Sequence, residues 1–556
     1  MKIQLQAFIF NALSILLVSA SAQTAQFDWF EYEGRDAVFS QPLPAGHFQN
    51  PILAGFYPDP SITRAGDTFY MVHSSFSYFP GIPIFKSTDL IHWQPLGHVL
   101  TRRSQLQVDQ AGVSRGIFAP TIRYHDGTFY VISTGIDDAG GNFIVTAKDP
   151  AGPWSELQLL PEIKGIDPDI FFDDDGKVYI AHNGEPEDTA LYEGHRAIWL
   201  WEYDLEKEEV VKNSGRVIVN GGVDLSQQPI WIEAPHIYKI NGWYYLLCAE
   251  GGTEKNHSEV VFRTKNLAQP FIPYTKNPIL TQRDLPADRP NPIATAGHAD
   301  LVQTPSGQWW AVFLATRNYN KDYFNTGRET FLLPVSWTDD WPIILPPGQA
   351  IPWQLKKPVG LKNTLDTKPL TGNFTWRDDF NQVSLSPTWN ILRSSSERPY
   401  QLAGDGYLKL QARQITLDEK RQPGFVGRRQ QHLTYEASTQ LQLPLADTVS
   451  AGITVFQSEM AHYFFALEKQ GSLNTLVLEM ADQSQPKALK RMALANAGEF
   501  IRFKISGNKD KVSFLYQTQN DKKWQTFAHE LDATLLSTKR AGGFVGTYLG
   551  LHSRTN

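Results

Sequence analysis

The sequence predicts an all-β protein, a five-bladed β-propeller followed by a β-sandwich, and three observations support this fold class. A hairpin-like segment recurs five times within the first 350 residues. From Phe374 onward, apolar and polar residues alternate over segments of strand length. No long amphipathic helical pattern competes with either signal, so helices are expected to contribute little.

Composition bounds the class of protein. Hydrophobic residues make up 41% of the 556 residues and charged residues 20%, which is typical of a folded globular chain rather than a disordered one. The net charge of −7 and the lack of a long basic run argue against nucleic acid as a partner. Aromatic residues reach 12%, and their flat apolar faces suit stacking on sugar rings. The single cysteine, Cys248, permits no internal disulfide and is expected in the core.

Residues 1–22 have the layout of a secretory signal peptide. Lys2 supplies a positive charge, an apolar stretch follows from Ala7 to Val18, and Ala20-Ser21-Ala22 is a small-residue cleavage site. A buried strand or an uncleaved anchor is the alternative, but the stretch is short for a ~20-residue membrane span. We expect cleavage after Ala22 and a soluble mature protein, secreted to the periplasm or the medium, with no membrane association.

The repeated segments define the first domain. Each reads as a strand, a Gly-containing turn and a second strand rich in aromatic and β-branched residues, which is a β-hairpin pattern. The five copies are DPSITRAGDTFYMVHSS from Asp59, APTIRYHDGTFYVISTG from Ala119, DPDIFFDDDGKVYIAHN from Asp167, APHIYKINGWYYLLCAE from Ala234 and HADLVQTPSGQWWAVFLA from His298. Consecutive starts are 48 to 67 residues apart, which is enough for a four-stranded unit each. A propeller over 48–350 fits best, because radial repetition protects the sheet edges.

A Pro-rich stretch separates this region from the second domain. The text PIILPPGQAIPWQLKKPVG follows Trp341 and predicts a linker or strap, assigned to 351–373. Beyond it, segments such as TYEASTQLQLPL, AGITVFQ, YFFALEK and FIRFKISG alternate in character and are separated by turn signals. The pattern predicts a β-sandwich over 374–556.

Aligning the five hairpins brings a set of polar residues into equivalent positions. The first position of the strand holds Asp59, Ala119, Asp167, Ala234 and His298, and the position before it holds Pro58, Phe118, Ile166, Glu233 and Gly297. The innermost strands of a propeller converge on the central channel, so equivalent positions in different blades face one another. Asp59, Asp167, Glu233, His298 and Phe118 are therefore expected to meet.

Three carboxylates and a histidine in one pocket suit acid–base hydrolysis of a glycoside. One carboxylic acid must stay protonated to donate to the leaving oxygen, and one carboxylate must stay ionised to activate water. A further negative group nearby raises the pKa of the acid. The alternative for each residue taken singly is a turn or a strand-start cap, common for Asp before Pro. A carboxylate at the start of the first strand in three of the five repeats favours a catalytic site over these single-residue explanations.

The order and spacing of several motifs resemble glycoside hydrolase family 43, in its branch of β-xylosidases and α-L-arabinofuranosidases. The motifs are FYPDPSI, GIFAP, GIDPDIFFDDDG, WIEAPHIYKINGWYYLLCAEGGT, AGHADLV and GRET. The resemblance covers about residues 48–350. The tail, from WRDDF through GGFVGTYLGL, resembles the concanavalin-like β-sandwich often appended to that branch.

The resemblance implies a role for each carboxylate. Asp59 matches the general base, Glu233 the general acid, and Asp167 the residue that tunes the pKa of the acid and orients it. Inversion of configuration follows, with the base and acid ~6.5–9.5 Å apart to admit a water, against ~5–5.5 Å in a retaining pair.

The resemblance also implies substrate-binding residues. Arg328, in GRET, matches an arginine that binds sugar hydroxyls, and a salt bridge to the adjacent Glu329 is the alternative. Phe118 stands where many relatives have tryptophan, which keeps a stacking face but shrinks it and removes the indole N–H. Phe76 resembles an aromatic of the pocket wall, with ordinary packing between blades as the alternative.

The resemblance implies no required cofactor. His298 matches a histidine that contacts a cation or a water cluster near the axis in some relatives, which leaves open a structural Ca²⁺ or Na⁺ at His298. A buried, hydrogen-bonded histidine is the other interpretation.

The function expected is a secreted, exo-acting, inverting glycosidase. It would release xylose, L-arabinose or both from the non-reducing ends of xylo-oligosaccharides or arabinose-substituted oligosaccharides of hemicellulose. An endo-acting arabinanase or xylanase is one alternative, and it would need an open cleft. A non-catalytic carbohydrate-binding propeller is the other, and it would not need three aligned carboxylates.

Overall fold

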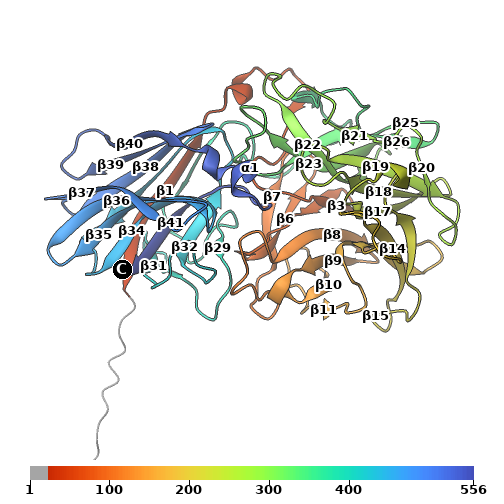
Figure 1. Ribbon diagram of the computed structural model, residues 1–556, viewed down its shortest axis with the longest axis horizontal. Coiled ribbons are helices and arrows are strands. Elements are labelled where there is room, and N and C mark those ends of the chain that lie inside the picture. Colours follow the sequence, from red (N-terminus) through yellow and green to blue (C-terminus); the bar gives the residue numbers. More distant parts are fainter. Residues whose placement is uncertain (1–22, 556) are drawn as a thin grey trace, which may run out of the picture.

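The computed structural model describes residues 23–555, which form two all-β lobes packed against each other (Figure 1). The expected signal peptide, residues 1–22, lies outside the described residues. Among residues 23–555 the helices are short: α1 (Thr538–Ala541) and the 3-10 helices η1 (Ala37–Ser40), η2 (Asp137–Ala139), η3 (Leu225–Gln227) and η4 (Thr534–Leu536). No helix in this range is long and apolar enough to cross a membrane.

The first lobe consists, within the described residues, of five separate antiparallel sheets with a few short ribbons at the periphery. The first sheet contains β3 (Ser61–Ala65), β4 (Thr68–Val72), β6 (Gly81–Ser87) and β7 (Gln94–Leu100). The second contains β8 (Ile117–His125), β9 (Thr128–Gly135), β10 (Gly141–Ala147) and β11 (Gln158–Leu159). The third contains β12 (Ile166–Phe172), β13 (Val178–Gly184), β14 (Ala197–Asp204), β15 (Glu209–Val210) and β16 (Arg216–Asn220).

The remaining two sheets complete the lobe. The fourth contains β17 (Glu233–Ile240), β18 (Trp243–Glu250), β19 (Ser258–Thr264), β20 (Ile272–Pro273) and β21 (Leu280–Thr281). The fifth contains β22 (Ile293–Gln303), β23 (Trp309–Arg317) and β24 (Glu329–Pro334). The peripheral ribbons pair β2 (His47–Gln49) with β27 (Gln354–Lys356), and β25 (Ser336–Thr338) with β26 (Trp341–Ile343).

The five predicted hairpins are the first two strands of the five sheets. Two of them turn on sequences that are typical of tight hairpins. Asp126-Gly127 has φ angles of 45° and 73°, and Asn241-Gly242 has 52° and 73°. Both central residues of a type I′ turn need positive φ, which Gly adopts freely and Asp or Asn tolerates.

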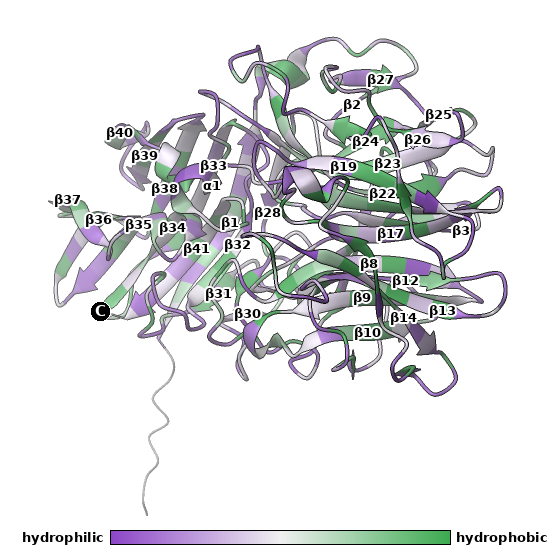
Figure 2. Cartoon of the chain, turned by 45° about the vertical axis from the view of Figure 1, so that its right-hand side comes forward, coloured by the Kyte–Doolittle hydropathy of each residue, from purple (hydrophilic) through white to green (hydrophobic). Residues whose placement is uncertain are grey.

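The first strands of the five sheets contact one another in a ring. β3 contacts β8, β8 contacts β12, β12 contacts β17, β17 contacts β22, and β22 contacts β3. Apolar side chains fill the spaces between neighbouring sheets, and Figure 2 shows strands such as β8, β10 and β22 as largely hydrophobic. The residues at the start of each inner strand are thereby brought to one end of a shared axis.

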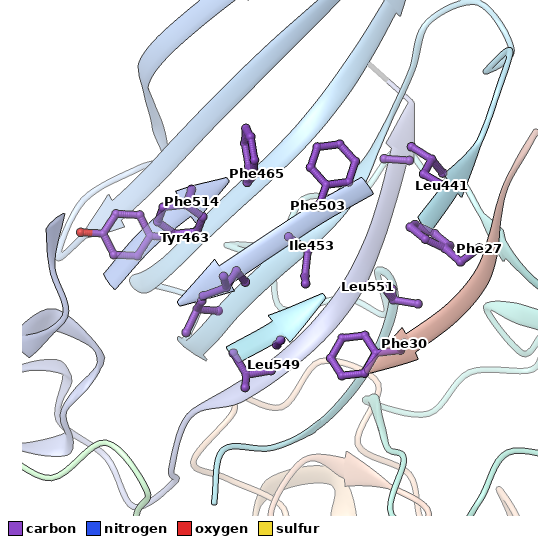
Figure 3. Close-up of a cluster of buried hydrophobic side chains, with 14 of the residues drawn as sticks. Phe27, Phe30, Leu441, Ile453, Tyr463, Phe465, Phe503, Phe514, Leu549 and Leu551 are labelled. Atoms are coloured by element: carbon purple, nitrogen blue, oxygen red, sulfur yellow. The ribbon is translucent and has the colours of Figure 1, made fainter. Parts of the chain in front are cut away.

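The second lobe is a sandwich of two antiparallel sheets. One contains, in order, β30 (Tyr400–Leu402), β31 (Leu408–Gln411), β1 (Thr24–Gly34), β33 (Thr434–Gln442), β38 (Phe500–Asn508), β39 (Lys511–Thr518) and β40 (Gln525–Asp532), with β28 (Thr375–Asp378) also paired to β1. The other contains β32 (Gly424–Arg429), β41 (Tyr548–Thr555), β34 (Val449–Ser458), β35 (Ala461–Gln470), β36 (Leu473–Asp482) and β37 (Lys487–Ala493). Side chains of both sheets meet in one apolar core, part of which Figure 3 shows.

The strand β1 belongs to the sandwich although it precedes the propeller in sequence. It pairs antiparallel with β31 and β28 on one side and with β33 on the other. Phe27 and Phe30 on β1 are buried in the sandwich core (Figure 3). The second lobe is therefore built from both ends of the described chain.

Polar contacts join the two lobes. Arg317 on β23 is buried, and its guanidinium binds the Glu329 carboxylate at 2.6 and 2.8 Å and the Asp36 carboxylate at 2.7 Å. It also donates to the backbone carbonyl of Gln431 in the sandwich at 2.7 Å. A short ribbon of β5 (Tyr78–Phe79) with β29 (Ile391–Leu392) adds backbone pairing across the junction.

Candidate active site

The start of the inner strand has the same irregular backbone in four of the five sheets. Asp59, Asp167, Ala234 and His298 have φ angles of 52°, 55°, 50° and 55°, all in the left-handed region. The pairing register shifts at this place in β12, β17 and β22. A bulge of this kind re-aims side chains and is frequent beside active sites. The hairpin alignment thus identified positions that share an unusual conformation.

Asp59 is buried and held on both of its carboxylate oxygens. Arg328 Nη1 donates to Oδ1 at 2.7 Å, and Ser74 Oγ donates to Oδ2 at 2.5 Å. His298 Nδ1 lies 3.7 Å from Oδ1. These donors hold the carboxylate in a fixed position, because charge-assisted hydrogen bonds are stronger than neutral ones.

Asp167 and Glu233 form a buried, electrostatically coupled pair. Burial and the neighbouring carboxylate of Asp59 raise the pKa of Glu233 to about 7, against the opposing charges of Arg328 and Arg196. Burial, then Glu233 and Asp59, raise the pKa of Asp167 well above its usual value, against a hydrogen bond from the Ala234 N–H. Two interacting carboxyls titrate as a pair, so this pair retains a proton toward neutral pH.

Arg328 binds Asp59 rather than its neighbour in sequence. The alternative of a salt bridge to the adjacent Glu329 is wrong, because Glu329 is held by Arg317. The Nε of Arg328 is buried without a partner among the described residues. One cation thus faces the three carboxylates with donor capacity left for a ligand.

His298 is buried beside Asp59 and neutral at ordinary pH. The pKa of His298 is lowered to about 3: burial lowers it most, the Asp59 carboxylate opposes this, and His236, His257 and Arg328 add to the lowering. Within residues 23–555 there is no group of three or more His, Cys, Asp or Glu placed to hold a metal ion. A structural Ca²⁺ or Na⁺ held by His298 with water therefore stays a prediction.

Three phenylalanines from both lobes form an aromatic wall. Phe76 is buried, with its ring centroid 5.1 Å from that of Phe118 and 6.1 Å from that of Phe544. Phe118 and Phe544 meet edge to face at 5.9 Å. The Arg328 guanidinium lies 5.8 Å from the Phe544 ring and 6.0 Å from the Phe76 ring. Both predicted aromatics therefore lie at the site, and the sandwich contributes a third.

A cavity of about 460 Å³ opens beside Arg328 at the junction of the lobes. The propeller lines it with Arg289, Thr295 and Arg328, and the sandwich lines it with Lys539 and Phe544. A cavity of this size holds a small sugar. The sandwich forms part of its boundary.

Ser74, Arg196 and Phe544 are site residues that the sequence did not reveal. Ser74 follows the first hairpin, and Arg196 precedes β14, so neither occupies the aligned strand-start position. Phe544 lies in a different domain, in the segment GGFVG after α1. The GGFVG segment is part of the tail that resembles the appended sandwich, but nothing in its sequence indicates contact with the propeller.

Three buried carboxyls beside one arginine suit the acid–base hydrolysis of a glycoside, which defines the class of enzyme that this site fits. The family model of glycosyl hydrolases family 43 matches residues 48–342, and that of the beta xylosidase C-terminal concanavalin A-like domain matches 377–556. The chain belongs to glycoside hydrolase family 43.

Similar proteins span nearly the whole chain. A xylosidase/arabinosidase of Butyrivibrio fibrisolvens is 39% identical over 91% of this chain and 96% of its own length. A non-reducing end α-L-arabinofuranosidase of Bacteroides ovatus is 34% identical over 92% of each. Among solved structures, a GH43_12 protein from a capybara gut metagenome has 39% identity and a TM-score of 0.90, covering 96% of this chain and 100% of that one. A xylan β-1,4-xylosidase from Bacillus halodurans has 30% identity and a TM-score of 0.82, with coverages of 91% and 97%.

Proposed function

We propose that this glycoside hydrolase is exo-acting and inverting, and that it releases xylose, L-arabinose or both from the non-reducing ends of hemicellulose oligosaccharides. The observation that carries the proposal is the buried set of Asp59, Asp167 and Glu233 around Arg328. The relatives named xylosidase/arabinosidase and non-reducing end α-L-arabinofuranosidase support the choice of pentosides.

In this mechanism Asp59 is the general base. Its carboxylate takes a proton from a water molecule, whose oxygen attacks the anomeric carbon from the face opposite to the leaving group. Arg328 and Ser74 hold the carboxylate in a fixed position through one hydrogen bond to each of its oxygens. Direct attack by water in one step inverts the configuration at the anomeric carbon.

Glu233 is the general acid. It donates its proton to the glycosidic oxygen as the bond to the anomeric carbon breaks, and the leaving sugar departs as an alcohol. A pKa of about 7 keeps this proton available at mildly acidic to neutral pH. Asp167 adds to the like-charge repulsion within the pair and so keeps a proton there.

Substrate would be held by the arginine and the aromatic wall. The planar guanidinium of Arg328 suits paired hydroxyls, and Phe76, Phe118 and Phe544 offer ring faces and edges to the sugar. His298, as a neutral imidazole with Nδ1 3.7 Å from Asp59 Oδ1, would pack against the general base. The mechanism assigns no step to a metal ion.

We also propose the domain arrangement predicted by sequence, with one correction. It has a five-bladed propeller over 48–350, a strap over 351–373 and a sandwich over 374–556, to which β1 (Thr24–Gly34) adds a strand. The ring of contacts among the five inner strands supports the blade count. A cleaved signal peptide over 1–22 and export from the cytoplasm complete the proposal, on the strength of the apolar stretch and its small-residue site.

The test is sugar release by the mature protein. 4-Nitrophenyl β-D-xylopyranoside and 4-nitrophenyl α-L-arabinofuranoside are assayed side by side, together with xylotriose and linear arabinan. We expect hydrolysis of at least one aryl pentoside, with single pentoses as products, and an initial product of inverted configuration by NMR.

Variants assign the activity to the site. Asp59→Ala is expected to abolish it, whereas Asp126→Ala, at an exposed carboxylate in a hairpin turn, should not change it. Internal cleavage of arabinan or xylan without release of single pentoses would replace the exo assignment by an endo one. Binding of oligosaccharide without turnover would show a carbohydrate-binding propeller instead.

A further inference from the structure

Trp231 lies in an unusual conformation close to the proposed acid. It precedes Glu233 by two residues, so their Cα atoms are at most about 7 Å apart. Its φ angle is 53°, which is rare for a bulky residue and recurs at ligand-binding positions. The side chain is nevertheless 36% exposed, although tryptophan is usually well buried. Burial in a core does not explain why a tryptophan is held in this backbone conformation.

Arg196 covers one face of the indole and links it to the site. Its guanidinium carbon lies 4.5 Å from the Trp231 ring centroid, in cation–π geometry. Glu185 forms an ion pair with the same guanidinium. The positive charge of Arg196 also lowers the pKa of the Glu233 carboxyl. Together with the closeness of Trp231 to Glu233 along the chain, this relates the Arg196–Trp231 pair to the proton donor.

Two glycines border the edge of the indole. A Cβ at Gly194 would lie 3.4 Å from Nε1, and one at Gly252 would lie 3.7 Å from Cδ1. The Gly194 carbonyl accepts a hydrogen bond from the Trp231 backbone N–H at 2.9 Å. The indole N–H has no hydrogen-bond partner within residues 23–555. The indole of Trp231 thus has an edge bordered by glycines and an N–H donor without a partner among the described residues.

We propose that Trp231, held by Arg196, forms the binding site for the leaving-group sugar. The ring of the neutral sugar that follows the scissile bond stacks on the indole, and the indole N–H donates to one of its hydroxyls. Glu233 then meets the glycosidic oxygen of a sugar that is already oriented. This inference rests on the proposed function, because it assigns the leaving-group side from the role of Glu233 as acid.

The experiment compares two substrates of the same pentose with different leaving groups. One is the disaccharide, xylobiose or α-1,5-arabinobiose according to which aryl pentoside the enzyme hydrolyses. The other is the corresponding glycosyl fluoride, whose C–F bond breaks with no sugar beyond it. We expect Trp231→Ala to lower kcat/KM for the disaccharide about tenfold and to leave that for the fluoride within about twofold.

A matched variant and a conservative variant accompany it. Trp337, on β25, is also 36% exposed and packs against Tyr245 and Trp309 away from the carboxylates, so Trp337→Ala should leave both substrates unchanged. Trp231→Phe keeps a stacking ring and should retain most of the disaccharide activity. Thermal unfolding of each variant establishes that it is folded.

Two results would overturn the subsite. One is an equal loss on both substrates in Trp231→Ala, which would mean general damage to the site. The other is no loss on the disaccharide. A wild-type enzyme that hydrolyses neither the disaccharide nor the fluoride refutes the proposed function itself, and that outcome is seen before any variant is made.

Discussion

At the scale of single residues, burial and neighbouring charges together set the pKa values of the buried carboxyls. Burial disfavours the ionised forms of Asp167 and Glu233, and adjacent carboxylates disfavour them further, while Arg328 acts on both in the opposite direction. Asp59 receives the direct ion pair with Arg328, whereas Asp167 and Glu233 are left with longer-range attraction. This asymmetry leaves a proton on the Asp167–Glu233 pair, which can supply the acid that acid–base catalysis requires.

The first prediction concerns the pH dependence of turnover. With a Glu233 pKa of about 7, kcat/KM should fall as pH rises through 7, because the acid loses its proton. Arg196→Gln removes a positive charge that lowers this pKa, so the alkaline limb of the pH profile should move to higher pH. Arg377→Gln, at a half-exposed arginine of the sandwich, serves as the control. An unchanged limb in Arg196→Gln would mean that Glu233 is not the titrating acid.

The second prediction concerns stability. The pKa of Glu233 is about 7 in the folded protein and near 4.5 when unfolded, so the folded state binds more protons between these values. The contribution of Glu233 to the stability of the wild type therefore falls as pH rises from about 4.5 to 7 and is constant above that range. Glu233→Gln removes this loss, and it should raise the free energy of unfolding by roughly 1–3 kcal/mol at pH 8 but little at pH 4.5.

Urea unfolding of wild type and variant at the two pH values is the measurement. The same variant should lose about 10²-fold or more in kcat on substrates with poor leaving groups. A gain in stability that was equal at both pH values would contradict the linkage argument, since a neutral packing effect has no pH dependence.

At the scale of elements, β1 is a central strand of the sandwich although it precedes the propeller in the sequence. Phe30 is fully buried, and its ring lies edge to face with Trp389 at a centroid distance of 5.1 Å. Asp36, just after β1, accepts hydrogen bonds from the backbone N–H groups of Leu433 and Thr434 and pairs with Arg317 of the propeller. The N-terminal segment is therefore part of the sandwich core and of the junction between lobes.

The third prediction follows from this packing. Phe30→Ala leaves a cavity in the sandwich core and should lower the free energy of unfolding by about 3–5 kcal/mol. Glu31→Ala, the neighbouring half-exposed position, should change it by no more than about 0.5 kcal/mol. Thermal or urea unfolding checks both. Similar small effects for the two variants would mean that β1 is not an integral strand of the sheet.

Sequence patterns predict where individual strands lie better than they predict which strands pair. Alternation in TAQFDWFEYEG is compatible with a strand, but pairing with β33 depends on residues some 400 positions later, which no local period encodes. Asp59, Asp167 and Glu233 could be found because the repeats place them in register. Arg196 and Trp231 could not be found in this way. Arg196 lies on the loop between β13 and β14 of one sheet, Trp231 lies on the segment between two sheets, and the course of both segments depends on tertiary contacts.

At the scale of the whole molecule, the active site is shared between lobes. The propeller carries the carboxylates, and the loop after α1 brings Phe544 against Phe76 and Phe118. The backbone N–H of Phe544 donates to Ser114 of the propeller at 3.0 Å, which fixes the loop. Docking of the sandwich therefore shapes the pocket as well as covering the propeller.

The fourth prediction tests this sharing. Phe544→Ala removes one ring of the aromatic wall and should lower kcat/KM for aryl pentosides about tenfold, chiefly through KM, because the carboxylates are untouched. Leu473→Ala, at a 51% exposed position on another sandwich strand, should have no effect. Full activity in Phe544→Ala would mean that the sandwich does not contribute to substrate binding.

The position of β1 in the sequence also affects the order in which the two lobes can fold during synthesis. Glu31 pairs with Ser438, so at roughly 5–20 residues per second the first strand waits some 20–80 s on the ribosome for its neighbour. The five propeller sheets can form before β28 (Thr375–Asp378), the first partner strand of β1 to be synthesised, so β1 has no partner strand while they form. In nascent chains arrested before Tyr400, a protease should therefore cut within residues 24–34, and the same bonds should resist it in the finished protein.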